Sequence, residues 1–184
     1  MIPEIGHIFL IITFVASIMQ ILFWIYNINS FHGFTVNILK KSALINFSLI
    51  LSSFFILTYS FIISDFSLLL VSNNSHSLKP LIYKISGVWG NHEGSLLLWV
   101  LILSTCTFLV SKKNSNINPK LLSSIIGVQT IILSLFLAFI LFTSNPFERV
   151  EILPLDGRGL NPLLQDPGLA LHPPMLYIGY VGLS

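Results

Sequence analysis

One uninterrupted apolar stretch, "LLSSIIGVQTIILSLFLAFILFT" at residues 121–143, decides the fold class of this chain. It contains no acidic or basic side chain. The hydrocarbon core of a bilayer is about 30 Å thick, and a helix needs on the order of 20 residues to cross it. The stretch therefore predicts a transmembrane helix.

Three other segments share this length and composition, and a fifth apolar segment begins close to the end of the sequence. The complete segments are residues 5–28, 42–64 and 94–111, and the partial one is residues 175–184. At about 1.5 Å per helical residue, the partial segment reaches only about half-way across a bilayer. The sequence predicts an all-α membrane protein, a single membrane domain over residues 1–184, with four complete transmembrane helices and the start of a fifth.

The composition agrees with a membrane location and excludes some functions. Of the 184 residues, 54% are hydrophobic and 9% are charged, whereas about a quarter of the residues in soluble domains are charged. Nine Lys and Arg against seven Asp and Glu leave a formal net charge of +2, which is too small and too dispersed for a nucleic-acid surface. The expected surroundings are a lipid bilayer, and no nucleic-acid partner is expected.

The lysines predict which side of the membrane each connecting segment faces, because basic residues are retained on the side that is not translocated. Segments 29–41 and 112–120 hold lysine and no acid, at positions Lys40, Lys41, Lys112, Lys113 and Lys120. We therefore place these two segments inside. The N-terminus and the two long connecting segments, residues 65–93 (the first connector) and residues 144–174 (the second connector), are predicted to face outward.

The first connector ends in a polar motif, "WGNHEGS" at residues 89–95. Asn91, or Ser95 a turn later, can cap the exposed amide groups of the helix that follows, and Glu93 is favoured near the positive end of that helix. Capping leaves three other residues of the motif unexplained, namely Trp89, Gly90 and His92. Two interpretations remain open, a helix cap alone or a cap combined with a scaffold or handover surface.

The second connector contains the prolines and charges of "NPFERVEILPLDGRGLNPLLQDPGLALHPP", residues 145–174. These prolines predict a stiff, non-helical segment. A residue before proline is driven towards extended geometry, and Pro173 suits the first position of a helix, so we predict that His172 is an N-cap with its imidazole along the outer membrane surface. Such an imidazole can ligate haem iron, and Arg158 can pair with a haem propionate. The alternatives are a structural histidine and a solvated arginine.

Two stretches resemble the CcmF family, the haem lyase subunit of a cytochrome c maturation system. They are "YKISGVWGNHEGSLLLW" (83–99) and "LNPLLQDPGLALHPPMLYIGYVG" (160–182). The resemblance implies a subunit that receives haem from a haem chaperone and helps to attach its vinyl groups, through thioether bonds, to the cysteines of a CxxCH motif in apocytochrome c.

Site residues are carried over from the family only where the motifs match. The resemblance implies that His172, in the "HPP" segment, is an axial ligand of the haem iron, and the haem is a b-type haem on its way to cytochrome c. From residue chemistry alone, Arg158 is expected to pair with a propionate of this haem. Trp89 is expected to frame the haem cavity, and its alternative is a place in an interfacial aromatic belt. No catalytic residue is assigned, and the rest of the polar motif is expected to form a scaffold or handover surface, through Gly90, Asn91, His92 and Glu93.

Several family features have no counterpart in this sequence. The tryptophan-rich "WWD" segment, a second external histidine and the haem-binding histidines within the membrane lie later in the family's sequence. We therefore expect a sister chain that carries the remaining helices and the WWD segment, from a divided gene or because the chain has been trimmed, together with other maturation subunits. The expected location is the mitochondrial inner membrane, with the connectors facing the intermembrane space; the alternative is the bacterial inner membrane.

Two other functions compete with this interpretation. A structural or proton-path subunit of a respiratory complex would place charged residues deep in its spans, whereas the four complete spans have uncharged interiors. A transporter would show inverted repeats and helices broken near the midplane. Cys106 is the only cysteine and has no CxxC partner, so the chain is predicted to be neither a c-type cytochrome nor a thiol reductant.

Overall fold

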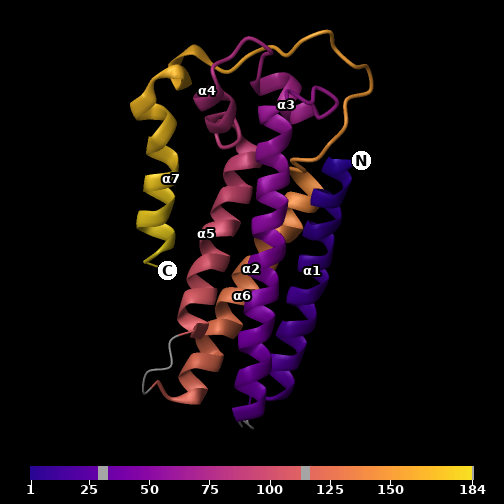
Figure 1. Ribbon diagram of the computed structural model, residues 1–184. Coiled ribbons are helices and arrows are strands. Elements are labelled where there is room, and N and C mark those ends of the chain that lie inside the picture. The colour runs from indigo at the N-terminus through magenta and orange to yellow at the C-terminus, as the bar shows by residue number, and fades with distance from the viewer. Residues whose placement is uncertain (29–32, 113–116, 184) are drawn as a thin grey trace.

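Four long helices form the body of the protein in the computed structural model, which describes residues 1–28, 33–112 and 117–183 (Figure 1). They are α1 (Ile2–Tyr26), α2 (Gly33–Ile62), α5 (His92–Lys112) and α6 (Pro119–Thr143). Each is long and apolar enough to cross a membrane. The predicted all-α membrane fold with four complete spans is confirmed.

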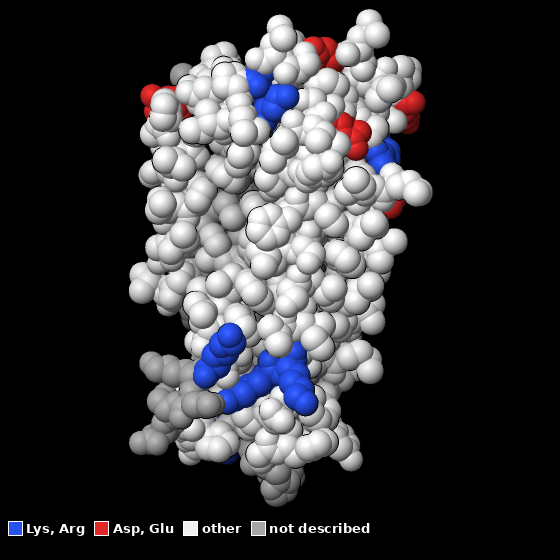
Figure 2. All heavy atoms as spheres, viewed as in Figure 1, with Lys and Arg blue, Asp and Glu red and all other residues white. Residues whose placement is uncertain are grey.

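The helix boundaries differ from the predicted spans mainly in α2, which begins at Gly33 rather than near residue 42. Lys40 and Lys41 therefore lie inside this helix. Lysine is tolerated there because it is a good helix former and its long side chain can reach the interface. Both line one surface with Lys112 of α5. Figure 2 shows basic side chains at the end of the bundle opposite the N-terminus, mixed charges at the N-terminal end and an uncharged belt between. Lys113 lies outside the described residues.

Close packing between the long helices relies on small and amide side chains, as expected where lipid removes most of the hydrophobic drive for helix association. A Cβ on Gly127 of α6 would lie 2.4 Å from the ring of Trp24 in α1, so only glycine fits there without movement. Asn46 of α2 donates a hydrogen bond to the side chain of Gln20 in α1 at 3.0 Å. Hydroxyl groups within the spans donate to carbonyls of their own helix, as at Thr13, Thr58, Thr107 and Thr130.

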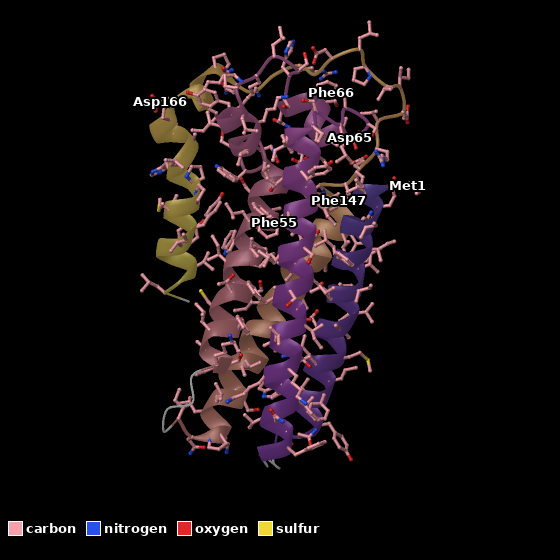
Figure 3. All side chains as sticks on the ribbon, viewed as in Figure 1. Met1, Phe55, Asp65, Phe66, Phe147 and Asp166 are labelled. Atoms are coloured by element: carbon pink, nitrogen blue, oxygen red, sulfur yellow. The ribbon has the colours of Figure 1, made fainter. Side chains whose placement is uncertain are left out.

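The two connectors fold together over the end of the bundle at which the N-terminus lies (Figure 1). The first connector contains two short helices, α3 (Leu69–Asn74) and α4 (Leu81–Ser86). An isolated antiparallel bridge joins Leu68 to Arg149 of the second connector. Phe147, labelled in Figure 3, packs on Gly6 of α1, where a Cβ would come within 2.5 Å of its ring. Both connectors therefore share one end of the bundle, and the side of the membrane on which that end lies stays a prediction.

The last helix, α7 (Pro167–Val181), follows a short 3-10 helix, η1 (Pro162–Gln165). The prediction that the second connector is non-helical as far as His172, with the helix beginning at Pro173, is therefore wrong. Asp166 is the N-cap of α7, its carboxylate accepts the Leu169 N–H at 3.0 Å, and Pro167 occupies the first turn. A strong start signal at Asp166 outweighs the two prolines at 173 and 174, which lie inside the helix.

Candidate functional site

His172 lies in the second turn of α7, and its side chain is exposed. The prediction that His172 is the N-cap is wrong, because Asp166 holds that position (Figure 3). His172 and Leu176 lie on the exposed side of α7. The side that packs against the bundle carries the buried and half-buried residues, which are Ala170, Pro173, Pro174, Tyr177 and Val181. The imidazole is thus presented away from the helices of this chain.

Trp89 of the first connector is joined directly to the helix that carries His172. Its indole N–H donates a hydrogen bond to the backbone carbonyl of Ala170, with 2.7 Å between the nitrogen and the oxygen. The backbone carbonyl of Trp89 accepts a hydrogen bond from the Ser95 hydroxyl at 2.7 Å. Ala170 precedes His172 by two residues, so this hydrogen bond links the first connector directly to the part of α7 that carries His172.

Asn91 caps helix α5. Its side-chain oxygen accepts the Gly94 N–H at 2.7 Å, and its side-chain nitrogen donates to the Gly87 carbonyl at 2.7 Å. The predicted cap at Asn91 is confirmed. Ser95, the alternative cap, instead bonds back to Trp89. The cap holds the polar motif in a tight turn directly after α4.

The remaining residues of the motif make different contacts. A Cβ on Gly90 would lie 3.0 Å from Leu160, so glycine allows the second connector to approach closely. The ring of His92 meets the edge of Phe139 in α6, with 6.0 Å between ring centroids. Glu93 lines a small cavity between the connectors, together with Glu148. Gly90 therefore serves packing, whereas His92 and Glu93 lie at the rim of the junction.

Arg158 lies in a different part of the second connector from His172. Its backbone N–H donates to the carbonyl of Ser72 in α3 at 2.7 Å, and its exposed side chain lines an open pocket of about 440 Å³. The charged residues of this pocket are of both signs, namely Glu148, Arg149, Glu151, Asp156 and Arg158. The backbone of Arg158 is thus bonded to α3, whereas Trp89 is bonded to α7. The predicted site residues Trp89 and His172 are linked, and Arg158 is held separately.

Two contacts that sequence reasoning missed hold the connectors in place, a hydrogen-bonded carboxylate and an ion pair. Asp156 accepts the Ser77 N–H at 3.0 Å, and the hydrogen bonds from Ser77 lower the pKa of this exposed carboxyl to about 2. Glu4 at the start of α1 pairs with Arg149, and hydrogen bonds from the N-terminal ammonium group and from Arg149 lower the pKa of Glu4 to about 2. Neither pairing has a local sequence signal, because its partners are far apart in the chain.

These features define an all-α membrane protein in which two connectors at one end of a bundle hold a proline-containing, histidine-bearing helix. Residues 89–184, which include the polar motif, α5, α6 and α7, match the family described as "Cytochrome C assembly protein". The chain belongs to this family.

Curated relatives match along the whole chain. It is 48% identical to "Cytochrome c-type biogenesis protein ccl1" of Rhodobacter capsulatus and 46% identical to "Cytochrome c-type biogenesis protein CycK" of Rhizobium meliloti, over all of this chain in each case. It is 38% identical to "Cytochrome c-type biogenesis protein CcmF" of Escherichia coli. The resemblance to CcmF predicted from two stretches is confirmed and extends to the whole sequence. The chain spans only 28% or less of the length of the first two relatives.

A solved structure has the same fold. The chain superimposes on "Cytochrome c Heme Lyase CcmF" with a TM-score of 0.81 and 23% sequence identity, over 100% of this chain and 28% of that one. This likeness supports the arrangement of helices described above. The roles of individual residues rest on other arguments.

Proposed function

We propose that this chain is a haem-handling part of the haem lyase of cytochrome c maturation. Its family membership supports a function in cytochrome c assembly, and the position of His172 is the observation that supports a role in holding haem. His172 stands exposed on a helix that a hydrogen bond from the first connector holds at the connector end of the bundle. In this proposal His172 is an axial ligand of a b-type haem that passes through the complex as substrate.

The residues of this chain fit one side of such a site. An exposed imidazole offers a nitrogen lone pair to the iron. Arg158 is proposed as a propionate partner because its side chain is exposed and a guanidinium can hold a carboxylate. Trp89 is proposed at the edge of the haem, beside the helix that carries the ligand. Gly90, Asn91, His92 and Glu93 are proposed to form the scaffold or handover surface beneath it.

The chemistry of attachment places a positioning demand on the protein. Haem supplies vinyl groups, and the cysteines of apocytochrome c supply the thiols that add to them. Holding the two partners in register converts an encounter in solution into a local reaction. His172 would fix the distance and tilt of the haem on the outer face, and no residue of this chain needs to take part in bond formation.

The partners are proposed from the resemblance to the CcmF family. We propose that a sister chain supplies the remaining helices and a WWD segment against the exposed side of α7, and that a haem chaperone, apocytochrome c and other maturation subunits complete the system. The proposed location is the mitochondrial inner membrane, with the connectors in the intermembrane space. The bacterial inner membrane is the alternative, and the relatives named above are bacterial. Fractionation of the source cells followed by antibody detection distinguishes the two.

The test is replacement of His172 by alanine in the intact complex purified with its partner chains. We expect haem content and the yield of holocytochrome c to fall by about tenfold or more, because an axial ligand is lost. The matched control is His76→Ala, a partly exposed histidine of the first connector that lies near Asp156 instead. Haem content and yield equal to those of the wild-type complex in the His172→Ala complex would refute the ligand role.

A further inference from the structure

The two adjacent prolines of α7 leave one backbone carbonyl without a local donor. In an α-helix the carbonyl of Ala170 would accept from the N–H of residue 174, and in a 3-10 turn from that of residue 173. Both positions are proline, which has no N–H. Ala170 is also buried, with 4% of its surface exposed. A buried carbonyl without a partner is costly, so this position requires a donor from elsewhere.

Trp89 supplies that donor. The indole N–H is directed at the Ala170 oxygen at a distance of 2.7 Å, which is short for a neutral hydrogen bond. Indole has a single N–H and no acceptor, so this contact uses its whole hydrogen-bonding capacity. The polar half of Trp89 is therefore committed to α7, and only the face of its ring is left for other contacts.

The first connector holds Trp89 rigidly in this position. The Ser95 hydroxyl bonds to the Trp89 carbonyl at 2.7 Å, and Asn91, the cap of α5, bonds to the Gly87 carbonyl at 2.7 Å. On the other side, the contact of Gly90 with Leu160 locates the second connector just before α7. Trp89 thus belongs to the frame of the bundle through α5, while its donor atom acts on α7.

We propose that Trp89 is the positioning residue of His172, which sets the rotation and height of α7 by satisfying the carbonyl that Pro173 and Pro174 leave without a donor. The inference rests on the proposed role of His172 as a haem ligand. His172 follows Ala170 by two residues within the same helix, so an anchor at the Ala170 carbonyl determines the direction of the imidazole. The polar motif and the proline pair then act together, because one supplies the hydrogen-bond donor that the other leaves missing, although they are far apart in the sequence.

The test removes the donor and then makes it unnecessary. Trp89→Phe keeps an aromatic ring and deletes the N–H. Pro174→Ala adds a backbone N–H four residues after Ala170, which gives its carbonyl a partner within the helix. The matched control is Trp99→Phe, because Trp99 also packs against α7, but through its ring on Tyr177 and Tyr180.

Two measurements are made on the intact complex for each variant. Hydrogen exchange of the α7 amides reports the anchoring of the helix and does not depend on haem. Electron paramagnetic resonance of the ferric haem reports the orientation of the ligating imidazole. We expect Trp89→Phe to speed exchange in α7 by about fivefold or more and to shift the resonance, Trp89→Phe with Pro174→Ala to restore both, and Trp99→Phe to leave the resonance unchanged.

The outcomes separate this inference from the proposed function. A resonance that depends on His172 in the wild-type complex but is unchanged in Trp89→Phe would overturn the positioning role while leaving the ligand role intact. Exchange in α7 that Pro174→Ala does not restore would also overturn it, because the carbonyl would not be the point of action. A wild-type complex whose haem is indifferent to His172→Ala would instead refute the proposed function, and the exchange data would then report the anchor alone.

Discussion

Helices α6 and α7 begin in the same way and are completed differently. Each has a side-chain cap, from Asn118 and from Asp166, and each has proline in the first turn. Helix α6 then continues without interruption and packs against α1, α2 and α5, whereas α7 contains two internal prolines and packs mainly against α5. Helix α6 is thus held by side-chain packing against three helices, whereas α7 has a smaller packed face and also receives a hydrogen bond from Trp89 of the first connector.

The largest effect on the free energy of unfolding is expected when the same substitution, glycine to alanine, is made in each of the two helices. Gly127→Ala in α6 places a Cβ 2.4 Å from the Trp24 ring, so we expect a loss of about 1–3 kcal/mol in the free energy of unfolding. The control is Gly179→Ala in α7, where nothing beyond the adjacent residues and the backbone of its own helix lies within 4 Å of the added Cβ. Helix propensity there predicts a gain of about 0.5–1 kcal/mol. Denaturation of the purified protein in detergent measures both.

The two results are informative in opposite ways. Equal effects at Gly127 and Gly179 would contradict the contrast between a packed and an open helix. A loss of stability for Gly179→Ala in the complete complex, but not in this chain alone, would show that a partner chain covers this side of α7.

A smaller effect is expected from the caps. Asp166→Ala removes the acceptor of the Leu169 N–H and is expected to destabilise the start of α7 by about 1 kcal/mol. Asn118→Ala removes the equivalent acceptor in α6, where the side chain bonds to the Lys120 N–H. Because packing on three helices holds α6, we expect faster hydrogen exchange to reach His172 in the first variant and to stay within the first turn of α6 in the second. Equal spread of exchange in the two helices would contradict this expectation.

The smallest effect is a pH dependence confined to the connector that leads into α7. The pKa of Asp156 is lowered from 3.8 to about 2 by hydrogen bonds from Ser77. A lowered pKa in the folded state stabilises the protein above the unfolded pKa, and this contribution is lost as the pH falls from about 4 to about 2. We expect the protection of the amides around Ser77, measured relative to their intrinsic exchange rates at each pH, to fall over that window, and Ser77→Ala to remove most of the change. Protection of these amides that does not change between about pH 4 and about pH 2 in the wild type would contradict a stabilising role for the Asp156–Ser77 hydrogen bonds.

Sequence reasoning located the spans closely and misplaced the site helix. The predicted span 121–143 lies within α6, and the predicted span 94–111 lies within α5. For α7 the prolines at 173 and 174 were interpreted as the start of the helix, since locally they remove donors and favour a boundary. The Asp166–Pro167 pair was an available start signal. The partner that makes the internal prolines tolerable, Trp89, had no local signal because it lies in the other connector.

The sequence by itself determined that this is a four-span helical membrane protein with a capped polar motif and a proline-flanked histidine. These features depend on residue type over one or two helical turns, so they can be predicted from hydropathy and capping alone. Only the tertiary structure decided that α7 begins at Pro167, and that an indole from the first connector satisfies the Ala170 carbonyl. A hydrogen bond between segments far apart in the chain depends on how the helices pack, and that packing is a property of the assembled bundle.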